Sequence, residues 1–274
     1  MRIFKNVQDF KDKNSESLSF IVGTNDDGKV LVSSLQEVKQ LLVGGSSGNA
    51  VSGFISKLVL RLSNSYSVED IHIVLIGSKS GELSILSGIP HLEYPVISDE
   101  EKAIKTLEWC LSEMDRRYHL LSCMATRNID GYNDKISSLE DKDKKRHEEI
   151  NNVDLVKLPQ MLVVIEELAD MMKCYGERTQ KAVCMLAQLG RACGMFLVIG
   201  THEIDEGIIT GPIKANIPST MAFAVDSEAE SRLIIGVGGA EKIKDPDRFL
   251  FFPQGEVEPK PATVIKNFDD LRID

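Results

Sequence analysis

A glycine-rich turn joins a buried strand to an amphipathic helix near the start of the chain, and this junction constrains the fold more than any other segment. QLLVG (40–44) is short and apolar, as a strand covered on both faces requires. SGFISKLVLRLSN (52–64) follows the turn and carries apolar residues at helical spacing. A strand, a glycine turn and a helix in this order predict the beginning of a βαβ unit.

The same alternation of strands and helices continues along the chain. Buried strands are expected at IHIVLIG (71–77), QMLVVIEE (160–167), MFLVIGT (195–201), TMAFAV (220–225) and RFLFF (248–252). Helices are expected over residues 101–127 and from about 180 to 193. Two short strands around Asp27-Gly28 indicate a hairpin before the first unit. We therefore predict an α/β fold of three layers, with a mostly parallel sheet between helices and a small N-terminal β-hairpin.

The composition limits the class of protein. The 274 residues include 42 acidic and 32 basic side chains, giving a net charge of −10, so the overall charge does not support nucleic-acid binding. The sequence contains no apolar run of membrane-spanning length and no secretory leader, so we expect a cytoplasmic protein without a membrane segment. Residues 1–16 are expected to form a polar lead-in, and about residues 137–156 a charged, solvated loop or frayed helix rather than a DNA-contacting arm.

The five cysteines are odd in number and lack the close pairing of metal sites, which favours reduced thiols. Cys174, Cys184 and Cys193 lie on or near one expected helix, and no basic residue nearby would activate them. We expect these three thiols to be part of the core.

The glycine turn occupies the position of a phosphate-binding loop, whose pattern is Gly-x-x-x-x-Gly-Lys-[Ser/Thr]. In that pattern the glycines let backbone N–H groups converge on the phosphates, the lysine neutralises their charge, and the hydroxyl binds Mg²⁺. Here Gly45 and Ser52 match the first glycine and the hydroxyl, but Ala50 and Val51 replace the second glycine and the lysine. Taken alone, this match is weak, because a glycine turn can precede any helix.

Several longer stretches, in order along the chain, strengthen the match. They are GELSILSGIPHL (81–92), MDRRYHLLSCMATRNIDGYN (114–133), LPQMLVVIEELADMM (158–172), LAQLGRACGMFLVIGT (186–201), ITGPIKANIPSTMAFAV (209–225) and SRLIIGVGGAEKI (231–243). With the leading hairpin, these stretches resemble the motor domain of FtsK/SpoIIIE-type DNA translocases over about residues 17–255. The resemblance implies a RecA-like P-loop NTPase domain over residues 17–274, from a hexameric, ATP-driven pump of double-stranded DNA.

The departures from the family pattern concentrate at positions that would face a nucleotide. The family's catalytic lysine falls on Val51, and its Asp-Glu pair of the Walker B strand falls on Glu166-Glu167. The strand that ends Ile-Asp-Pro-Lys in the family here ends Ile76-Gly77-Ser78-Lys79. The family's Thr-Gln-Arg-Pro reads Thr201-His202-Glu203-Ile204. Both Walker motifs are therefore degenerate.

The resemblance implies a set of candidate site residues. Glu167 and Glu166 would be the catalytic pair, and Ser52 with Glu166 would hold the metal of Mg-ATP. The nucleotide would contact Gly45, Ser46, Ser47, Gly48, Asn49, Ala50, Val51, Ser52, His202 and, as an arginine finger toward a neighbouring subunit, Arg232. Each has a plain alternative: carboxylates at a strand end, a hydrogen-bonded histidine, and an arginine in a surface ion pair.

Three functions remain open on the sequence. The first is a pseudo-ATPase that binds nucleotide weakly or not at all and serves as a scaffold or regulatory subunit, in a homo-oligomer or beside an active motor. The second is an active translocase acting on double-stranded DNA, in which other residues compensate for Val51. The third is a degenerate motor domain of the kind found in type VII secretion, binding a peptide or protein partner. Loss of the lysine removes electrostatic stabilisation worth a few kcal/mol, so we expect a weak or inactive ATPase.

Overall fold

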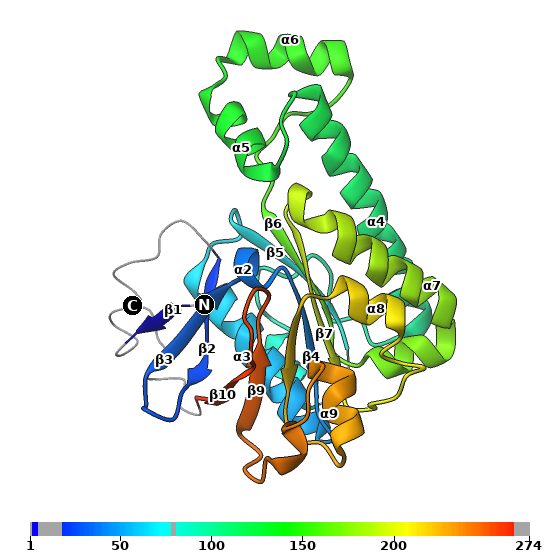
Figure 1. Ribbon diagram of the computed structural model, residues 1–274. Helices are drawn as coiled ribbons and strands as arrows, with labels where there is room; N and C mark the ends of the chain where they lie inside the picture. Colours follow the sequence, from blue (N-terminus) through cyan, green and yellow to red (C-terminus); the bar gives the residue numbers. More distant parts are fainter. Residues whose placement is uncertain (1, 5–17, 78–80, 266–274) are drawn as a thin grey trace.

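A computed structural model describes residues 2–4, 18–77 and 81–265, which form a single sheet flanked by helices (Figure 1). The strands are β1 (Arg2–Phe4), β2 (Ser19–Thr24), β3 (Val30–Ser34), β4 (Gln40–Gly44), β5 (Ile71–Ile76), β6 (Gln160–Ile165), β7 (Met195–Thr201), β8 (Ser219–Ala222), β9 (Arg248–Phe252) and β10 (Lys260–Thr263). The α-helices are α2 (Leu35–Val38), α3 (Gly48–Ser65), α4 (Glu100–Cys123), α5 (Ile129–Ser138), α6 (Asp141–Asn151), α7 (Leu168–Leu189), α8 (Gly211–Asn216) and α9 (Glu228–Ile235). Short 3-10 turns lie at η1 (Gly81–Leu86), η2 (Gly190–Cys193) and η3 (Ala240–Lys242).

The ten strands follow the order β1-β3-β2-β10-β9-β8-β4-β7-β6-β5. From β8 to β5 the strands are parallel, as the buried apolar segments predict. From β8 to β1 every pairing is antiparallel, so the sheet is mixed rather than mostly parallel. The expected N-terminal hairpin is β2–β3, and it joins the sheet through β10, whose Thr263 pairs with Thr24.

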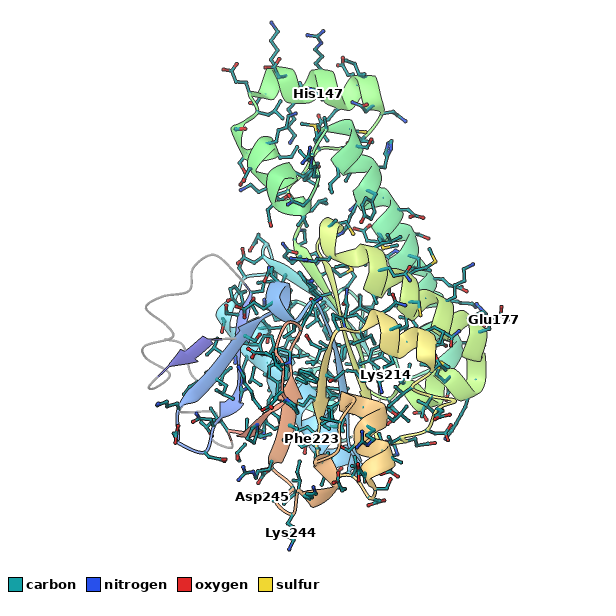
Figure 2. All side chains as sticks on the ribbon, in the orientation of Figure 1. His147, Glu177, Lys214, Phe223, Lys244 and Asp245 are labelled. Atoms are coloured by element: carbon teal, nitrogen blue, oxygen red, sulfur yellow. The ribbon has the colours of Figure 1, made fainter. Side chains whose placement is uncertain are left out.

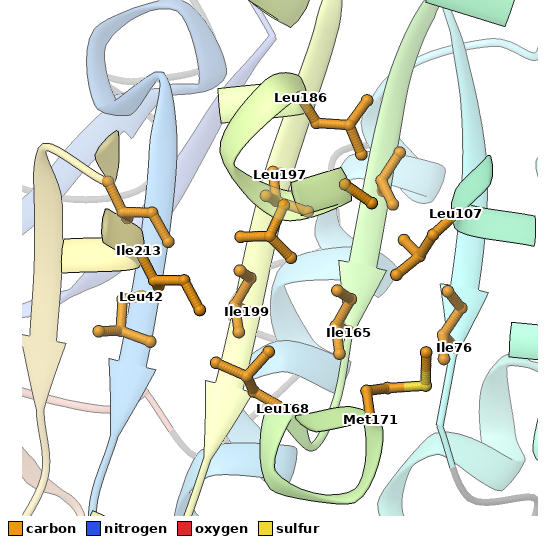
Figure 3. Close-up of a cluster of buried hydrophobic side chains, with 14 of the residues drawn as sticks. Leu42, Ile76, Leu107, Ile165, Leu168, Met171, Leu186, Leu197, Ile199 and Ile213 are labelled. Atoms are coloured by element: carbon orange, nitrogen blue, oxygen red, sulfur yellow. The ribbon is translucent and has the colours of Figure 1, made fainter. Parts of the chain in front are cut away.

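Alternate residues along the parallel strands supply two separate cores, one on each face of the sheet. On one face, Leu42, Val163 and Ile199 pack with α4, α7, α8 and α9, as Figure 3 shows for part of this cluster. On the other face, Leu41, Val43 and Val198 pack with α2, α3 and η1. Helices on both faces of a parallel block confirm the predicted α/β fold of three layers.

Several boundaries differ from the sequence expectation. The helix expected from about residue 180 begins at Leu168 and is interrupted by non-helical φ/ψ angles at Tyr175. Gly176 follows this residue, and the interruption breaks the apolar periodicity, so the pattern revealed only the second half of α7. Of the two alternatives for the charged segment, the helix is observed rather than the loop, since Asp141–Asn151 form α6. The lead-in at 1–16 lies outside the described residues except for β1, which pairs with β3.

The second half of α4, with α5 and α6, projects from the body as an arm (Figure 1). The arm has a small core of its own, to which Leu120, Tyr132 and Leu158 contribute. Its return segment is fixed by Asn133, whose side chain donates to the Leu158 carbonyl at 2.8 Å and accepts from the Leu158 amide at 2.9 Å. No residue of α6 is buried. The arm therefore has a hydrophobic cluster separate from the two cores of the sheet, with α6 on its outside.

The cysteines are all free thiols, as expected. Cys193 is buried as predicted, Cys184 is half-buried, and Cys174 is exposed, so the expectation of a core position was wrong for Cys174. Cys174 lies just before the interruption of α7, where the helix surface turns toward solvent.

Gly200 in β7 lies close to Val51 of α3 and to Glu166, the residue that follows β6. A Cβ atom there would lie 2.3 Å from the Glu166 carbonyl oxygen and 2.9 Å from Cγ1 of Val51. We expect Gly200→Ala to lower the free energy of unfolding by about 2 kcal/mol, because backbone must shift to admit the methyl group. Gly211→Ala is the matched control, since Gly211 has open space around its Cα, and it should change stability by less than about 0.5 kcal/mol. Urea unfolding measures both, and equal stabilities would contradict the close packing.

Burial sets the reactivity of the thiols. Burial raises the pKa of Cys110 to about 12 and that of Cys193 to about 11, so neither forms thiolate near neutral pH. We expect a thiol reagent at pH 8 to modify Cys174 first and to leave Cys110 and Cys193 unmodified until the protein unfolds. Mass spectrometry of digested samples, taken with and without urea, identifies the labelled sites. Early labelling of Cys110 in the native protein would show that the α4 side of the core opens.

Candidate functional site

The carboxyl ends of β4, β7, β6 and β5 lie together at one end of the sheet, beside the N-terminus of α3. A cleft of about 420 Å³ opens there. Gly48 and Ser52 of α3 line one wall, Glu166 and Glu167 form the end of the sheet, and His202 follows β7. The structure thus brings together candidate residues that lie more than a hundred positions apart in the sequence.

The glycine turn itself is tied to neighbouring strands. The Gly45 amide donates to the Thr201 carbonyl at 3.3 Å, and the Ser46 amide donates to the Ala224 carbonyl at 2.9 Å. Both N–H groups are therefore used within the protein. Gly45 also requires the absence of a side chain, because a Cβ would lie 2.7 Å from Cβ of Phe223, which Figure 2 places in the lower part of the body.

The helix after the turn begins early. Gly48 is the first residue of α3, so Ala50 and Val51 are already helical. The side chain of Val51 is only 1% exposed and packs in the core beneath the sheet, where Cγ1 points toward Gly200. The residue at the lysine position is therefore a core residue that does not line the cleft.

The remaining residues of the turn lie beside a second cleft. Ser47, Asn49 and Ala50 line a space of about 390 Å³ on the other side of the α3 N-terminus, together with Phe223 and Asp247. Asn49 lines both clefts. A ligand that spans the two would pass over the first turn of α3.

The carboxylate of Glu167 is fully engaged by protein donors. One oxygen, Oε1, accepts from the Thr201 hydroxyl at 2.6 Å and from the Ala169 amide at 2.9 Å, which caps α7. The other, Oε2, accepts from the His202 amide at 2.9 Å and contacts Nδ1 of the same ring. The ring also lies near Gly48, with Cγ and Nδ1 3.6 Å from the position that a Cβ there would take. His202 is therefore hydrogen-bonded to Glu167 at the end of β6, as the hydrogen-bonded alternative for this residue supposed.

Glu166 is buried, at 8% exposure, and faces Gly77. A Cβ on Gly77 would lie 2.5 Å from Oε2 of Glu166, so only glycine fits beside this carboxylate. The neighbouring positions Ser78 and Lys79 lie outside the described residues.

The cleft is acidic. Asp99, Glu100 and Asp170 line it in addition to Glu166 and Glu167. Burial, and then the charge of Glu167, raise the pKa of Asp170, as expected where carboxylates gather. Among the described residues that line the cleft, His202 is the only side chain that can carry a positive charge.

This charge decides the fit of Mg-ATP. The N-terminus of α3 and the Ser52 hydroxyl suit a phosphate group. The five carboxylates that line the cleft repel a phosphate group. Among the described residues that line it, no lysine or arginine takes the place of the missing lysine. The described part of the site therefore fits the β- and γ-phosphates of Mg-ATP poorly.

Two charged residues that the family pattern would place near a nucleotide, Arg232 and Glu203, do not line the cleft. Arg232 on α9 pairs with Glu228 at 2.6 Å, the surface ion pair that was the alternative for this residue. Its reach toward a neighbouring subunit remains a prediction. Glu203 pairs with Lys173 of α7.

The sequence reading missed Asp99 and Asp170 as cleft residues. Asp99 caps α4 and Asp170 lies in the first turn of α7, positions where acids are common for helix stability alone. Nothing in the local pattern marks them as part of a site.

Comparison with known proteins adds sequence relatives. Residues 5–206 match the model of the FtsK/SpoIIIE family. The chain is 38% identical over 251 residues to the DNA translocase FtsK of Clostridium tetani, covering 92% of this chain and 32% of that protein. It is 36% identical over 253 residues to the DNA translocase FtsK of Listeria monocytogenes, covering 91% and 32%. The chain therefore spans about a third of the length of these relatives.

Solved structures share the fold. The conjugation coupling protein TcpA of pCW3, solved with ATPγS, superposes with a TM-score of 0.74 at 23% identity, covering 93% of this chain and 68% of that one. The cytoplasmic domain of the type VII secretion ATPase EccC of Thermomonospora curvata superposes with a TM-score of 0.75 at 17% identity, covering 93% and 30%. These likenesses confirm the predicted RecA-like P-loop ATPase fold. Among the described helices, none is long and apolar enough to cross a membrane.

The position of Val51 makes a testable prediction. Val51→Lys should lower the free energy of unfolding by about 3 kcal/mol, because a longer, charged side chain enters a packed core. Asn49→Lys is the matched control, since Asn49 is exposed in the same turn of α3, and it should change stability by less than about 0.5 kcal/mol. Urea unfolding at pH 7 measures both. A Val51→Lys protein as stable as the parent would show that this position can turn its side chain toward the cleft.

Proposed function

The chain belongs to the FtsK/SpoIIIE family, and on that basis we propose that it is a motor-domain homologue that keeps the fold without efficient ATP turnover. Its role would be that of a scaffold or regulatory subunit. It would act on the cytoplasmic side, in a homo-oligomer or beside an active motor of the same family.

The state of Glu167 carries the proposal. A general base must offer a free lone pair to the proton it accepts, within hydrogen-bond distance. Here Thr201, His202 and Ala169 donate to both oxygens of the carboxylate. An attacking water would have to displace these donors, and with them the cap of α7.

The absence of a lysine at position 51 also lowers the expected rate of ATP hydrolysis. Removing one preorganised charge from a transition state costs a few kcal/mol, a hundredfold to a thousandfold in rate. The acidic lining of the cleft adds repulsion toward a polyphosphate. Both effects oppose turnover more than they oppose the weak binding of a phosphate at the α3 N-terminus.

An active translocase of double-stranded DNA is the second candidate. The identities of 36–38% to proteins named DNA translocase FtsK favour it, and so does the presence of Ser52 and Glu167 at the cleft. The third candidate, a domain like those of type VII secretion, has support only from the fold. One such structure, of EccC from Thermomonospora curvata, contains a signal sequence peptide, but it is 13% identical to this chain, with a TM-score of 0.62.

ATP hydrolysis, measured with and without linear double-stranded DNA, tests the proposal. We expect no turnover above background, and a change in melting temperature of less than about one degree with millimolar Mg-ATP. A ligand at a hundred times its Kd would stabilise the protein by about 2.7 kcal/mol, which is several degrees for a domain of this size.

Two variants show where any activity comes from. Glu167→Gln alters the candidate base, and Glu177→Gln is its control, an exposed glutamate on the outer part of α7 (Figure 2). DNA-stimulated hydrolysis that survives Glu177→Gln and disappears in Glu167→Gln would overturn the proposal in favour of an active motor. Mg-ATP binding without hydrolysis would leave it standing.

A further inference from the structure

A histidine and a cysteine contact each other on the outer part of α4. Sγ of Cys123 lies 3.6 Å from Nε2 of His119, which precedes it by one helical turn. His119 is exposed and Cys123 is half-buried. In the described part of the chain, no other histidine is hydrogen-bonded to a thiol.

The helix holds this pair in place. Leu120, Leu121 and Met124 are buried in the core of the arm and fix the other side of the same turns (Figure 1). The backbone of His119 and Cys123 is therefore set before any ligand binds. Only the two side chains have to adjust, and they already touch.

The distance between the two atoms is the one that a tetrahedral metal ion requires. In tetrahedral zinc sites the Zn–S bond is about 2.3 Å and the Zn–N bond about 2.0–2.1 Å. With the tetrahedral angle between them, these bonds place sulfur and nitrogen about 3.6 Å apart. A right angle, as in octahedral coordination, would place them about 3.1 Å apart. The observed 3.6 Å therefore matches a tetrahedral ion.

The types of donor atom select the same class of metal. A cysteine thiolate and a neutral imidazole suit borderline-soft ions such as Zn²⁺. Mg²⁺ and Ca²⁺ prefer oxygen ligands and bind poorly to sulfur. Geometry and donor chemistry thus agree on a zinc-like ion.

The charge at this end of α4 favours a cation. Cys123 is the last residue of the helix, where the helix dipole leaves a partial negative charge. No lysine or arginine lies in this last turn. Farther back on the helix, Arg116 and Arg117 both donate to the carboxylate of Glu113, at 2.6–2.8 Å.

We propose that His119 and Cys123 bind one Zn²⁺ ion, with Nε2 and Sγ as its protein ligands and water at the other two positions. On binding, the Cys123 thiol releases its proton to solvent, and thiolate and imidazole each donate an electron pair to the ion. Within the described residues no third histidine, cysteine or carboxylate completes the set. Because the protein supplies two of the four ligands, we expect a Kd of the order of 10 µM.

The inference goes beyond the proposed function and does not depend on it. His119 lies about 28 Å along α4 from Glu100, which lines the cleft. The site can bind a metal whether or not the chain hydrolyses ATP. Its test measures metal binding and not turnover, so the two proposals can fail separately.

Titration of Co²⁺ into the purified full-length protein, kept reduced, tests the site. Co²⁺ accepts the same tetrahedral geometry, and a thiolate ligand gives it a charge-transfer band in the near ultraviolet. We expect this band to appear with one ion per chain and to disappear when Zn²⁺ is added. Cys123→Ser should abolish the band, and His119→Gln should raise the Kd at least about tenfold, since one of two protein ligands is lost.

Two matched controls are available. Cys174→Ser removes an exposed thiol, and His147→Gln removes a histidine of α6, and neither residue belongs to the pair. Both variants should bind Co²⁺ like the parent. Circular dichroism verifies that all four variants keep the fold.

Protection of the thiol gives a second readout. Zn²⁺ should slow the alkylation of Cys123 by iodoacetamide and leave that of Cys174 unchanged, as mass spectrometry of the digested protein measures. The proposal would be overturned by a parent protein without the charge-transfer band, or by a band that survives Cys123→Ser. An unchanged Kd in His119→Gln would also overturn it, because the thiol would then bind alone. So would one ion for every two chains, because a second copy would then complete the site.

Discussion

The in-register pairing of the parallel strands is the constraint on which the rest of this molecule depends. Gly44 of β4 lies beside Thr201 of β7, and Ile76 of β5 lies beside Ile165 of β6. Because these strands run in one direction, the residues that follow each of them are brought together at the carboxyl end of the sheet. The glycine turn, the two glutamates and His202 meet there although each follows a different strand. A shift in any register would separate them and move apolar side chains to the wrong face.

At this end of the sheet, two positions that were expected to be catalytic make structural contacts. The position where the family has a lysine holds a core valine, and the glutamate of the strand end caps a helix and binds a histidine. Both contacts add packing or hydrogen bonds to the folded chain. In the glycine turn, the Gly45 and Ser46 amides donate to strand carbonyls of the protein, which leaves only the N-terminus of α3 to face a phosphate.

The fold could be predicted from the sequence to a large extent, because strands buried on both faces leave a clear apolar signal. β7 and β9 have the predicted bounds, and β6 differs only where Glu166 and Glu167 leave the strand. The antiparallel half was harder, since β10 contains Lys260 and Pro261 and does not look like a strand. In the site, the positions of Glu167 and His202 followed from order along the chain. Their mutual contact, the burial of Val51 and the acids contributed by Asp99 and Asp170 depend on packing between distant elements, which no local pattern records.

The pairing of β10 with β2 has a consequence for how such a domain can be combined with others. β2, which opens the described segment 18–77, and β10, the last described strand, are hydrogen-bonded neighbours. A unit with this arrangement can be inserted into a surface loop of another protein, or repeated in tandem, with short connections and without threading the chain through itself. Gene fusion and duplication therefore meet little topological resistance in this fold, and a copy that loses its chemistry can be retained beside one that keeps it.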